Sequence, residues 1–279
     1  MFSLRTPVLF GSILIVFVFV SINELTTTKK ITKYSKWGSC VQDGIALWKS
    51  SDEEFWKHTV NISSKCQNLL DLNIVKLSDY KVHIFPVYPN SESIHLTVGV
   101  SDDIQAENQL KLKTPRCQII GTSPQWQAGN FSFGSVGQYY PVAIGIDSGA
   151  VNITIESNGT NNETSVSPEP ESVIQLDMVY FLKNVLKHKY YTSVWFNTVF
   201  NDLPDMLYSN GKLEDNGITI CQMNLMIHGK TIAKQLLLNI ISDRRYAAIV
   251  DQLEDFINIY LLNFDNDKCK NELGLEKKR

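Results

Sequence analysis

The chain has 279 residues, of which 43% are hydrophobic and 20% are charged, and its formal net charge is −3. This apolar content is too high for a disordered chain, and the length suffices for one sizeable folded domain. The acidic balance excludes the basic footprint of a nucleic-acid-binding protein, so nucleic acid is not expected as a partner.

An uncharged apolar segment lies near the start of the chain. Residues 7 to 22 carry no charge and follow Arg5. The run is longer than the usual core of a signal peptide and slightly shorter than a full membrane span. A buried core helix would also be apolar, but the N-terminal position and the flanking arginine favour a targeting segment. No clear small-residue cleavage site follows. We therefore predict a signal-anchor within residues 1–30 that contacts the membrane, with a cleaved signal peptide as the alternative.

Glycosylation sequons behind that segment indicate the compartment. Asn-x-Ser/Thr occurs five times, at Asn61, Asn130, Asn152, Asn158 and Asn162. Together with the apolar segment they predict a glycoprotein of the secretory pathway. It would be a single-pass membrane protein with a lumenal or extracellular domain, or a secreted protein if the segment is cleaved.

The chain has five cysteines, which would then meet an oxidising environment. Their spacing shows no zinc pattern and fixes no pairing. Four of them could form two disulfides and leave one thiol. Cys117 and Cys221 lie in apolar, strand-like runs, which are typical of free cysteines in a core.

The region before the main domain is predicted to be partly helical. Residues 23–36 are polar and predict a short stem. Residues 51–72 predict a helix that is capped by Ser51, with Glu54 three residues later as in a capping box. We assign residues 31–80 to this stem and N-terminal helical region, and residues 81–279 to the main domain.

Strands and helices alternate along the main domain. Helices are predicted at residues 103–113, 174–189 (after a strand-like start) and 231–245. Strands are predicted at residues 93–100, 116–121, 139–146, 151–157, 193–196, 217–229 and 256–264. Apolar strands that alternate with helices indicate a Rossmann-like, doubly wound α/β fold with a mostly parallel sheet. The polar stretch 157–172, which holds two sequons, predicts a glycosylated surface loop.

Three turns after predicted strands are the places where such a sheet would bind a ligand. Gly99 ends the first strand, and its turn could bring a ligand close to the backbone. A dinucleotide loop has three glycines, however, and Ser101 stands where the second would be. Ser123 ends the second strand, where an acid often holds ribose hydroxyls, and Asn197 follows the strand 193–196. An ordinary turn is the alternative interpretation at each place.

Other catalytic patterns are absent from the sequence. It has no Gly-x-Ser-x-Gly elbow, no Walker loop and no His-Glu-x-x-His. We therefore predict no metal and assign no catalytic residue.

The segments, taken in order, resemble the nematode group of FkbM-type methyltransferase-domain proteins. The resemblance covers roughly residues 36 to 270 and rests on residues 36–41, 96–110, 117–124, 139–149, 173–182, 193–200, 216–229, 242–248 and 260–269. It implies a class I methyltransferase fold with S-adenosylmethionine as cofactor, behind an N-terminal membrane segment. It also implies O-methylation of a small-molecule or glycan hydroxyl.

The sequence departs from the family pattern where the cofactor would bind. The family usually has Gly-Ala-Asp-Pro after the second strand, and here Ser123 replaces the acid. The family usually has Trp-x-Asp-Ala-Glu-Gly in the later strand, and here Asn197 and Val199 replace both acids. The contacts that the resemblance leaves for the cofactor are Gly99, Ser101, Ser123 and Asn197.

Two functions follow from these departures. One is a methyltransferase that is weakened or inactive because the motif acids are replaced. The other is a non-catalytic lumenal or extracellular binding domain on the same fold. A lumenal glycosyltransferase would suit the topology, but we assign none of the acids in the sequence to a metal site.

Overall fold

The computed structural model describes residues 32–48, 51–78, 80–124, 132–153, 171–197, 203–252 and 256–276. In these ranges no helix is long and apolar enough to cross a bilayer. The predicted signal-anchor lies outside them, as does most of the predicted glycosylated loop.

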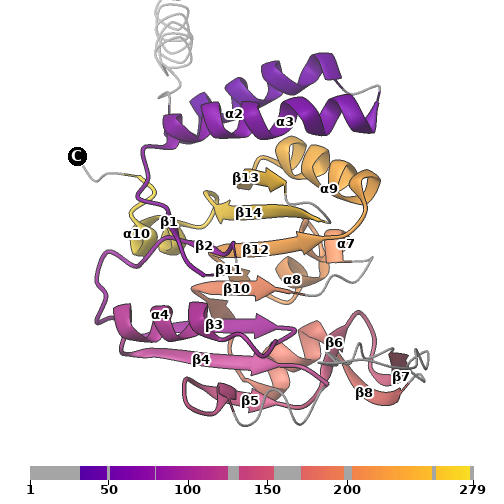
Figure 1. Cartoon of the computed structure of the whole chain (residues 1–279). Helices are drawn as coiled ribbons and strands as arrows, with labels where there is room; N and C mark the ends of the chain where they lie inside the picture. The colour runs from indigo at the N-terminus through magenta and orange to yellow at the C-terminus, as the bar shows by residue number, and fades with distance from the viewer. Residues whose placement is uncertain are drawn as a thin grey trace, which may run out of the picture.

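A seven-stranded sheet forms the centre of the molecule (Figure 1). Its spatial order is β13 (Tyr246–Gln252), β14 (Ile257–Asn263), β12 (Gln222–Ile227), β10 (Ser193–Phe196), β3 (Ser93–Val98), β4 (Cys117–Thr122) and β5 (Gln138–Tyr140). Strand β14 is antiparallel to both its neighbours, and the pairs from β12 to β5 are parallel. The prediction of a Rossmann-like, mostly parallel α/β sheet is thus confirmed.

The order of the strands is more informative than their number. In chain order, β5 at one edge is the third strand of this sheet. From that edge the strands run third, second, first, fourth, fifth, seventh and sixth, and the seventh is the antiparallel one. A sheet with this order and one antiparallel seventh strand has the topology of the class I methyltransferase fold, as the resemblance implies.

Helices cover both faces of this sheet. Helix α9 (Lys230–Asp243) packs on one face through Ala233, Leu236, Leu237 and Ile240, which are buried with Leu96 and Val98 in the larger core. Helix α4 (Gln105–Lys113) packs on the other face through Ala106 and Leu110, which share a second cluster with Trp195. Burial on both faces explains why the strands are continuously apolar.

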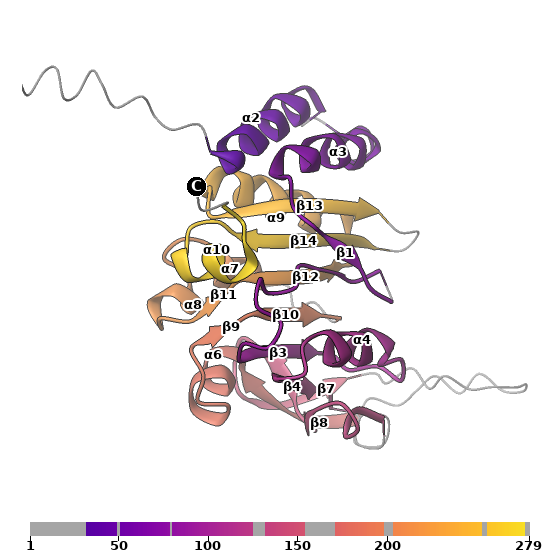
Figure 2. The ribbon, with the colours of Figure 1, turned by 90° about the vertical axis from the view of Figure 1, so that its left-hand side faces the viewer.

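A helical hairpin covers the β13 edge of the sheet in both views (Figures 1 and 2). It consists of α2 (Lys33–Ile45) and α3 (Asp52–Gln67). Ser51 accepts a hydrogen bond from the Glu54 N–H at 3.5 Å, which confirms the predicted cap. The Trp56 indole N–H donates to the Lys230 carbonyl at 3.0 Å, and the Val250 N–H donates to the Ser63 hydroxyl at 2.8 Å. The first bond ties the hairpin to α9, and the second occupies an N–H of the edge strand β13 that would otherwise be open to pairing.

Shorter elements complete the structure. The helical ones are η1 (Ala46–Trp48), η2 (Asn68–Leu70), α6 (Met178–Tyr180), the π-helical turn η3 (Phe181–Val185), α7 (Leu203–Leu207), α8 (Lys212–Asp215) and α10 (Asp267–Leu273). The strands are β1 (Val75–Lys76), β2 (Val82–His83), β6 (Ala143–Gly145), β7 (Gly149–Ile153), β8 (Glu171–Asp177), β9 (Tyr190–Tyr191) and β11 (Thr219–Ile220). Strands β6, β8 and β7 form a separate small sheet.

Four predicted element boundaries are corrected by the structure. The predicted stem is wrong at its end, because α2 already begins at Lys33, where Thr32 accepts a hydrogen bond from the Ser35 N–H. The predicted strand 139–146 divides into β5 and β6, which belong to different sheets, because Pro141 has no N–H for a ladder. The predicted strand 217–229 divides into β11 and β12 at Cys221. The helix predicted to Arg245 ends at Asp243, where Arg244 turns left-handed with φ 61°.

Two disulfides are present, Cys40–Cys66 and Cys221–Cys269, and Cys117 is a buried free thiol. The interpretation of Cys117 as a core thiol is confirmed, and that of Cys221 is wrong. The chain breaks its strand at Cys221, so the side chain is free to meet α10. Of the sequon residues, Asn61 and Asn152 are exposed, and Asn130, Asn158 and Asn162 lie outside the described ranges.

Candidate functional site

The four predicted contact residues lie at one edge of the central sheet. Gly99 directly follows β3, Ser123 directly follows β4, and Asn197 directly follows β10. Strand β3 pairs in parallel with both β4 and β10, so these three carboxyl ends are neighbours. Ser101 belongs to the same turn as Gly99. The structure therefore brings the four predicted contact residues together at the carboxyl edge of the sheet.

The turn at Gly99 keeps the backbone geometry expected of it, with φ 84°. That conformation is open to glycine at no steric cost. The N–H groups of Gly99 and Val100 both donate to the Thr122 carbonyl, at 2.8 and 3.0 Å. The Gly99 carbonyl accepts from the Asn197 side-chain amide at 3.0 Å. These backbone groups of the turn are thus already bonded within the protein.

Ser123 is turned inward. It is 6% exposed, its N–H donates to the Tyr140 carbonyl at 3.3 Å, and its carbonyl accepts from the Tyr139 hydroxyl at 2.8 Å. Burial raises the pKa of Tyr139, partly opposed by the bond to Ser123, so this hydroxyl stays a donor at neutral pH. A short polar side chain in this environment can replace only part of a carboxylate's capacity to hold two hydroxyls.

Apolar side chains close the end of β4. Phe133 is fully buried and Val100 is 5% exposed. A Cβ placed on Gly121 would lie 2.6 Å from a ring carbon of Phe133 and 2.6 Å from a methyl of Val100. Glycine is therefore required for this close packing, and the two side chains seal the strand end against solvent.

The carboxylates near this edge serve the fold. Asp103 accepts a hydrogen bond from the Gln105 N–H at 2.8 Å, just before the start of α4. Ser101 is exposed, and its hydroxyl donates to the Asp103 carbonyl at 3.2 Å. Glu107, in the first turn of α4, points into the core and is 2% exposed. None of these three residues presents a carboxylate where a ribose would need one after β4.

A chain of buried polar side chains behind the edge was not predicted. It runs from Ser193 through His95 and Thr97 to Glu107, and Lys81 lies at its end; all five are at most 3% exposed. Burial is the main cause that holds the pKa of His95 well below its usual range, so the imidazole is neutral.

The direction of the hydrogen bonds in this chain is determined by Glu107. The Thr97 hydroxyl donates to the Glu107 carboxylate at 2.9 Å, so Thr97 accepts from His95 Nε2–H at 3.0 Å. His95 Nδ1 then accepts from the Ser193 hydroxyl at 2.6 Å. A serine, a histidine and a carboxylate occur in this order in hydrolases, but here every member is closed to solvent. The sequence did contain a signal for this chain. His95 and Thr97 are alternate polar residues of β3, so both point to the α4 face of the sheet.

No cluster of three His, Cys, Asp or Glu side chains that could hold a metal occurs among the described residues. Val199 lies outside them, as does the rest of the turn after Asn197.

Comparisons with known proteins place this chain far from characterised ones. No protein-family model matches it, and no curated protein matches it. Solved structures with some likeness include Aeropyrum pernix fibrillarin with natively bound S-adenosyl-L-methionine (8% identity, TM-score 0.34, covering 62% of this chain and 68% of that one). The METTL16 methyltransferase domain gives 10% identity and a TM-score of 0.35, covering 82% of this chain and 67% of that one.

A third solved structure is the human methyltransferase 10 domain containing protein, with 8% identity and a TM-score of 0.36, covering 84% of this chain and 98% of that one. Similarities this low do not define the fold. The strand order of the central sheet does so.

Proposed function

We propose that this protein is a glycosylated domain of the secretory pathway, built on the class I methyltransferase fold, whose carboxyl edge binds S-adenosylmethionine weakly or not at all. Its role would then be that of a non-catalytic binding domain. The FkbM-type group remains the family to which we assign it.

The observation that carries this proposal is the internal use of polar groups at the carboxyl edge. The Gly99 carbonyl bonds to Asn197, the Gly99 N–H bonds to Thr122, and Ser123 bonds to Tyr139 and Tyr140 through its backbone. A cofactor that bound through these groups would have to break such bonds, and the desolvation of a buried polar group that loses its partner costs about 1–3 kcal/mol. Ser123 and Asn197 carry no charge with which to offset that cost.

The compartment is supported by chemistry that lies away from this edge. Disulfides persist in oxidising compartments and are rare in the cytosol, and the structure has two of them. The sequon residues Asn61 and Asn152 are exposed and so can carry glycans. The apolar residues 7–22 would direct the chain there as an anchor or as a cleaved signal.

A combined glycan and thiol assay tests the compartment. In protein purified from secretory cells, glycosidase treatment is expected to increase gel mobility. Denaturation without reductant is expected to expose one reactive thiol, that of Cys117. As a control, Cys117→Ser should expose none. Unchanged mobility together with five reactive thiols would contradict a secretory location.

A working O-methyltransferase is the second candidate, because the strand order and the positive φ of Gly99 are retained. S-Adenosylmethionine would then be the cofactor, with Ser123 and Asn197 as polar anchors and a small-molecule or glycan hydroxyl as acceptor. Positioning alone can supply much of the rate of a group transfer. A working methyltransferase would differ from a non-catalytic binding domain in having a measurable affinity for S-adenosylmethionine.

A further inference from the structure

A polar cavity lies at the edge of the sheet opposite to the carboxyl edge. It has a volume of about 830 Å³. Its walls are formed by the amino ends of β3 and β4, by residues 187–192 and by α10. This volume is in the range of small-molecule sites. The cavity is separated from Gly99, Ser123 and Asn197 by the length of the strands.

Cationic side chains gather around this cavity. Arg116 comes from the start of β4, Lys187 and Lys189 from the segment before β9, and Lys268 from α10. Among the described lining residues the acidic one is Glu92, which pairs with Arg116 at 2.8 Å. The whole chain has a net charge of −3, so this local excess of positive charge is not a consequence of overall composition. Such a cleft attracts anions.

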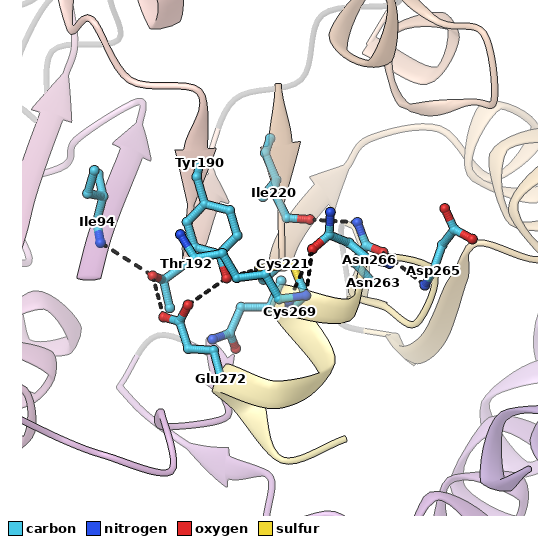
Figure 3. Close-up of a disulfide and its surroundings, with 12 residues drawn as sticks. Ile94, Tyr190, Thr192, Ile220, Cys221, Asn263, Asp265, Asn266, Cys269 and Glu272 are labelled. Atoms are coloured by element: carbon cyan, nitrogen blue, oxygen red, sulfur yellow. Dashed lines mark hydrogen bonds between the residues drawn. A yellow bond between two sulfur atoms is a disulfide. The ribbon is translucent and has the colours of Figure 1, made fainter. Parts of the chain in front are cut away.

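The floor of the cavity is fixed by hydrogen bonds (Figure 3). The hydroxyls of Tyr190 and Thr192 donate to the two oxygens of Glu272, at 2.5 and 2.7 Å. The Lys268 ammonium lies 3.3 Å from the centroid of the Tyr190 ring. The Glu272 carboxylate, the other acid in contact with this site, is thus engaged through both oxygens by hydroxyl donors.

The Cys221–Cys269 disulfide holds the wall that carries Lys268. Cys269 is adjacent to Lys268 in α10, and its partner Cys221 lies between β11 and β12. Asn266 caps α10 by accepting from the N–H groups of Lys268 and Cys269 at 3.0 and 3.2 Å. Lys268 is therefore held in position before any ligand arrives, which reduces the entropy lost on binding.

Lys187 occupies a position that favours glycine. It follows Leu186, the C-cap of the helical turn η3, and it has φ 60°. The next N–H, that of His188, donates back to the Leu182 carbonyl at 3.1 Å. Glycine is the usual residue in this left-handed position after a helix. A lysine there is strained, and it places a cation on the cavity.

We propose that this cavity binds a sulfated oligosaccharide. Sulfate groups would pair with Lys187, Lys189 and Lys268, and a sugar hydroxyl would bond to the exposed amide of Gln118. A nucleotide fits less well, because Lys268 already covers the Tyr190 ring on which a base could stack. The choice of a sulfated sugar as the ligand rests on the proposed secretory location. The inference that the cavity binds an anion rests on its cationic side chains alone.

The test uses the full protein from secretory cells and a size-defined heparin tetrasaccharide in calorimetric titration. We expect a dissociation constant of roughly 10–100 µM that weakens as salt rises, since exposed charges are screened. The variant Lys187→Gln/Lys189→Gln/Lys268→Gln should bind about tenfold or more weakly. The matched control Lys36→Gln/Lys65→Gln/Lys212→Gln removes the same charge from exposed sites and should bind within about twofold of the wild type.

A second variant separates binding from folding. Lys187→Gly should lower the affinity severalfold while the thermal midpoint stays the same or rises, because glycine relieves the left-handed position. Equal losses in the two triple variants would overturn the proposal, as would a silent titration. Binding of ATP with no binding of the tetrasaccharide would overturn the ligand class. Detection of S-adenosylmethionine binding would count against the proposed function and leave this site unaffected.

Discussion

Replacing Lys81 with methionine is expected to lower the free energy of unfolding by about 3–5 kcal/mol. The Lys81 ammonium lies 3.9 Å from the Glu107 carboxylate and 5.2 Å from the centroid of the Trp195 ring. Lys81 is 3% and Glu107 is 2% exposed. Methionine retains much of the apolar stem but removes the cation, so the Glu107 carboxylate remains buried without that partner. Urea unfolding of the purified protein measures the loss.

A double-mutant cycle distinguishes this coupling from general damage to the core. Glu107→Gln alone leaves Lys81 buried without its carboxylate, and it should also destabilise the protein. The double variant Lys81→Met/Glu107→Gln removes both charges and should cost clearly less than the sum of the two single changes. Strict additivity would contradict the view that these charges stabilise one another.

Acidification from pH 6.5 to 5.0 is expected to remove about 3 kcal/mol of stability through His83 and His95. Burial lowers the pKa of His83 from 6.5 to about 3, and burial is also the main cause that lowers the pKa of His95. Below pH 6.5 the unfolded chain binds a proton at each histidine and the folded protein does not. Stability is therefore complete above pH 6.5 and falls by about 1.4 kcal/mol per pH unit for each histidine, until the folded pKa is reached.

Urea titrations at several pH values measure this slope, and His83→Phe is the matched variant. Phenylalanine can keep the ring contacts of His83 with Phe85 and Trp195, and Gln222 retains its bond to the Ile84 carbonyl. The variant should show about half of the wild-type slope between pH 6.5 and 5. A wild-type protein that is equally stable at both pH values would show that the two imidazoles are not buried and neutral.

The strands and their carboxyl ends were predictable because they depend on local patterns. Continuous apolar runs marked β3, β4, β10 and β14, and Gly99, Ser123 and Asn197 then lay together once those strands were parallel. The spatial order of the strands could not be predicted from any single segment of the sequence. It depends on long-range pairing, which a single sequence does not display.

The failures have a common physical origin in tertiary contacts. Strand β13 contains Ala247, Ala248 and Gln252, a composition that suits a helix, and its pairing with β14 overrides that preference. Cys221 looked like a core thiol because its partner Cys269 is distant in the chain, with a sequence separation of 48. The basic cavity was missed because its cations come from three separate segments.

The buried chain from Ser193 to Glu107 was missed for a related reason. Its members are single polar residues in apolar strands, and each is acceptable only because another fills its hydrogen-bonding capacity. Gly99 and Asn197 at the carboxyl edge satisfy each other in the same way, because the Asn197 amide donates to the Gly99 carbonyl. A sequence can show that an acid has been replaced, but the structure shows what the replacing residue binds.

Calorimetric titration of the folded protein with S-adenosylmethionine tests the central claim most directly. The proposed function predicts no binding heat up to about 1 mM cofactor, an affinity weaker than about −4 kcal/mol. The pair Asn197→Asp/Val199→Glu, which places acids where the FkbM-type pattern has them, should then improve binding in a matched titration. A wild-type dissociation constant near 1 µM, about −8 kcal/mol, would contradict the claim and show that the carboxyl edge holds its cofactor without those acids.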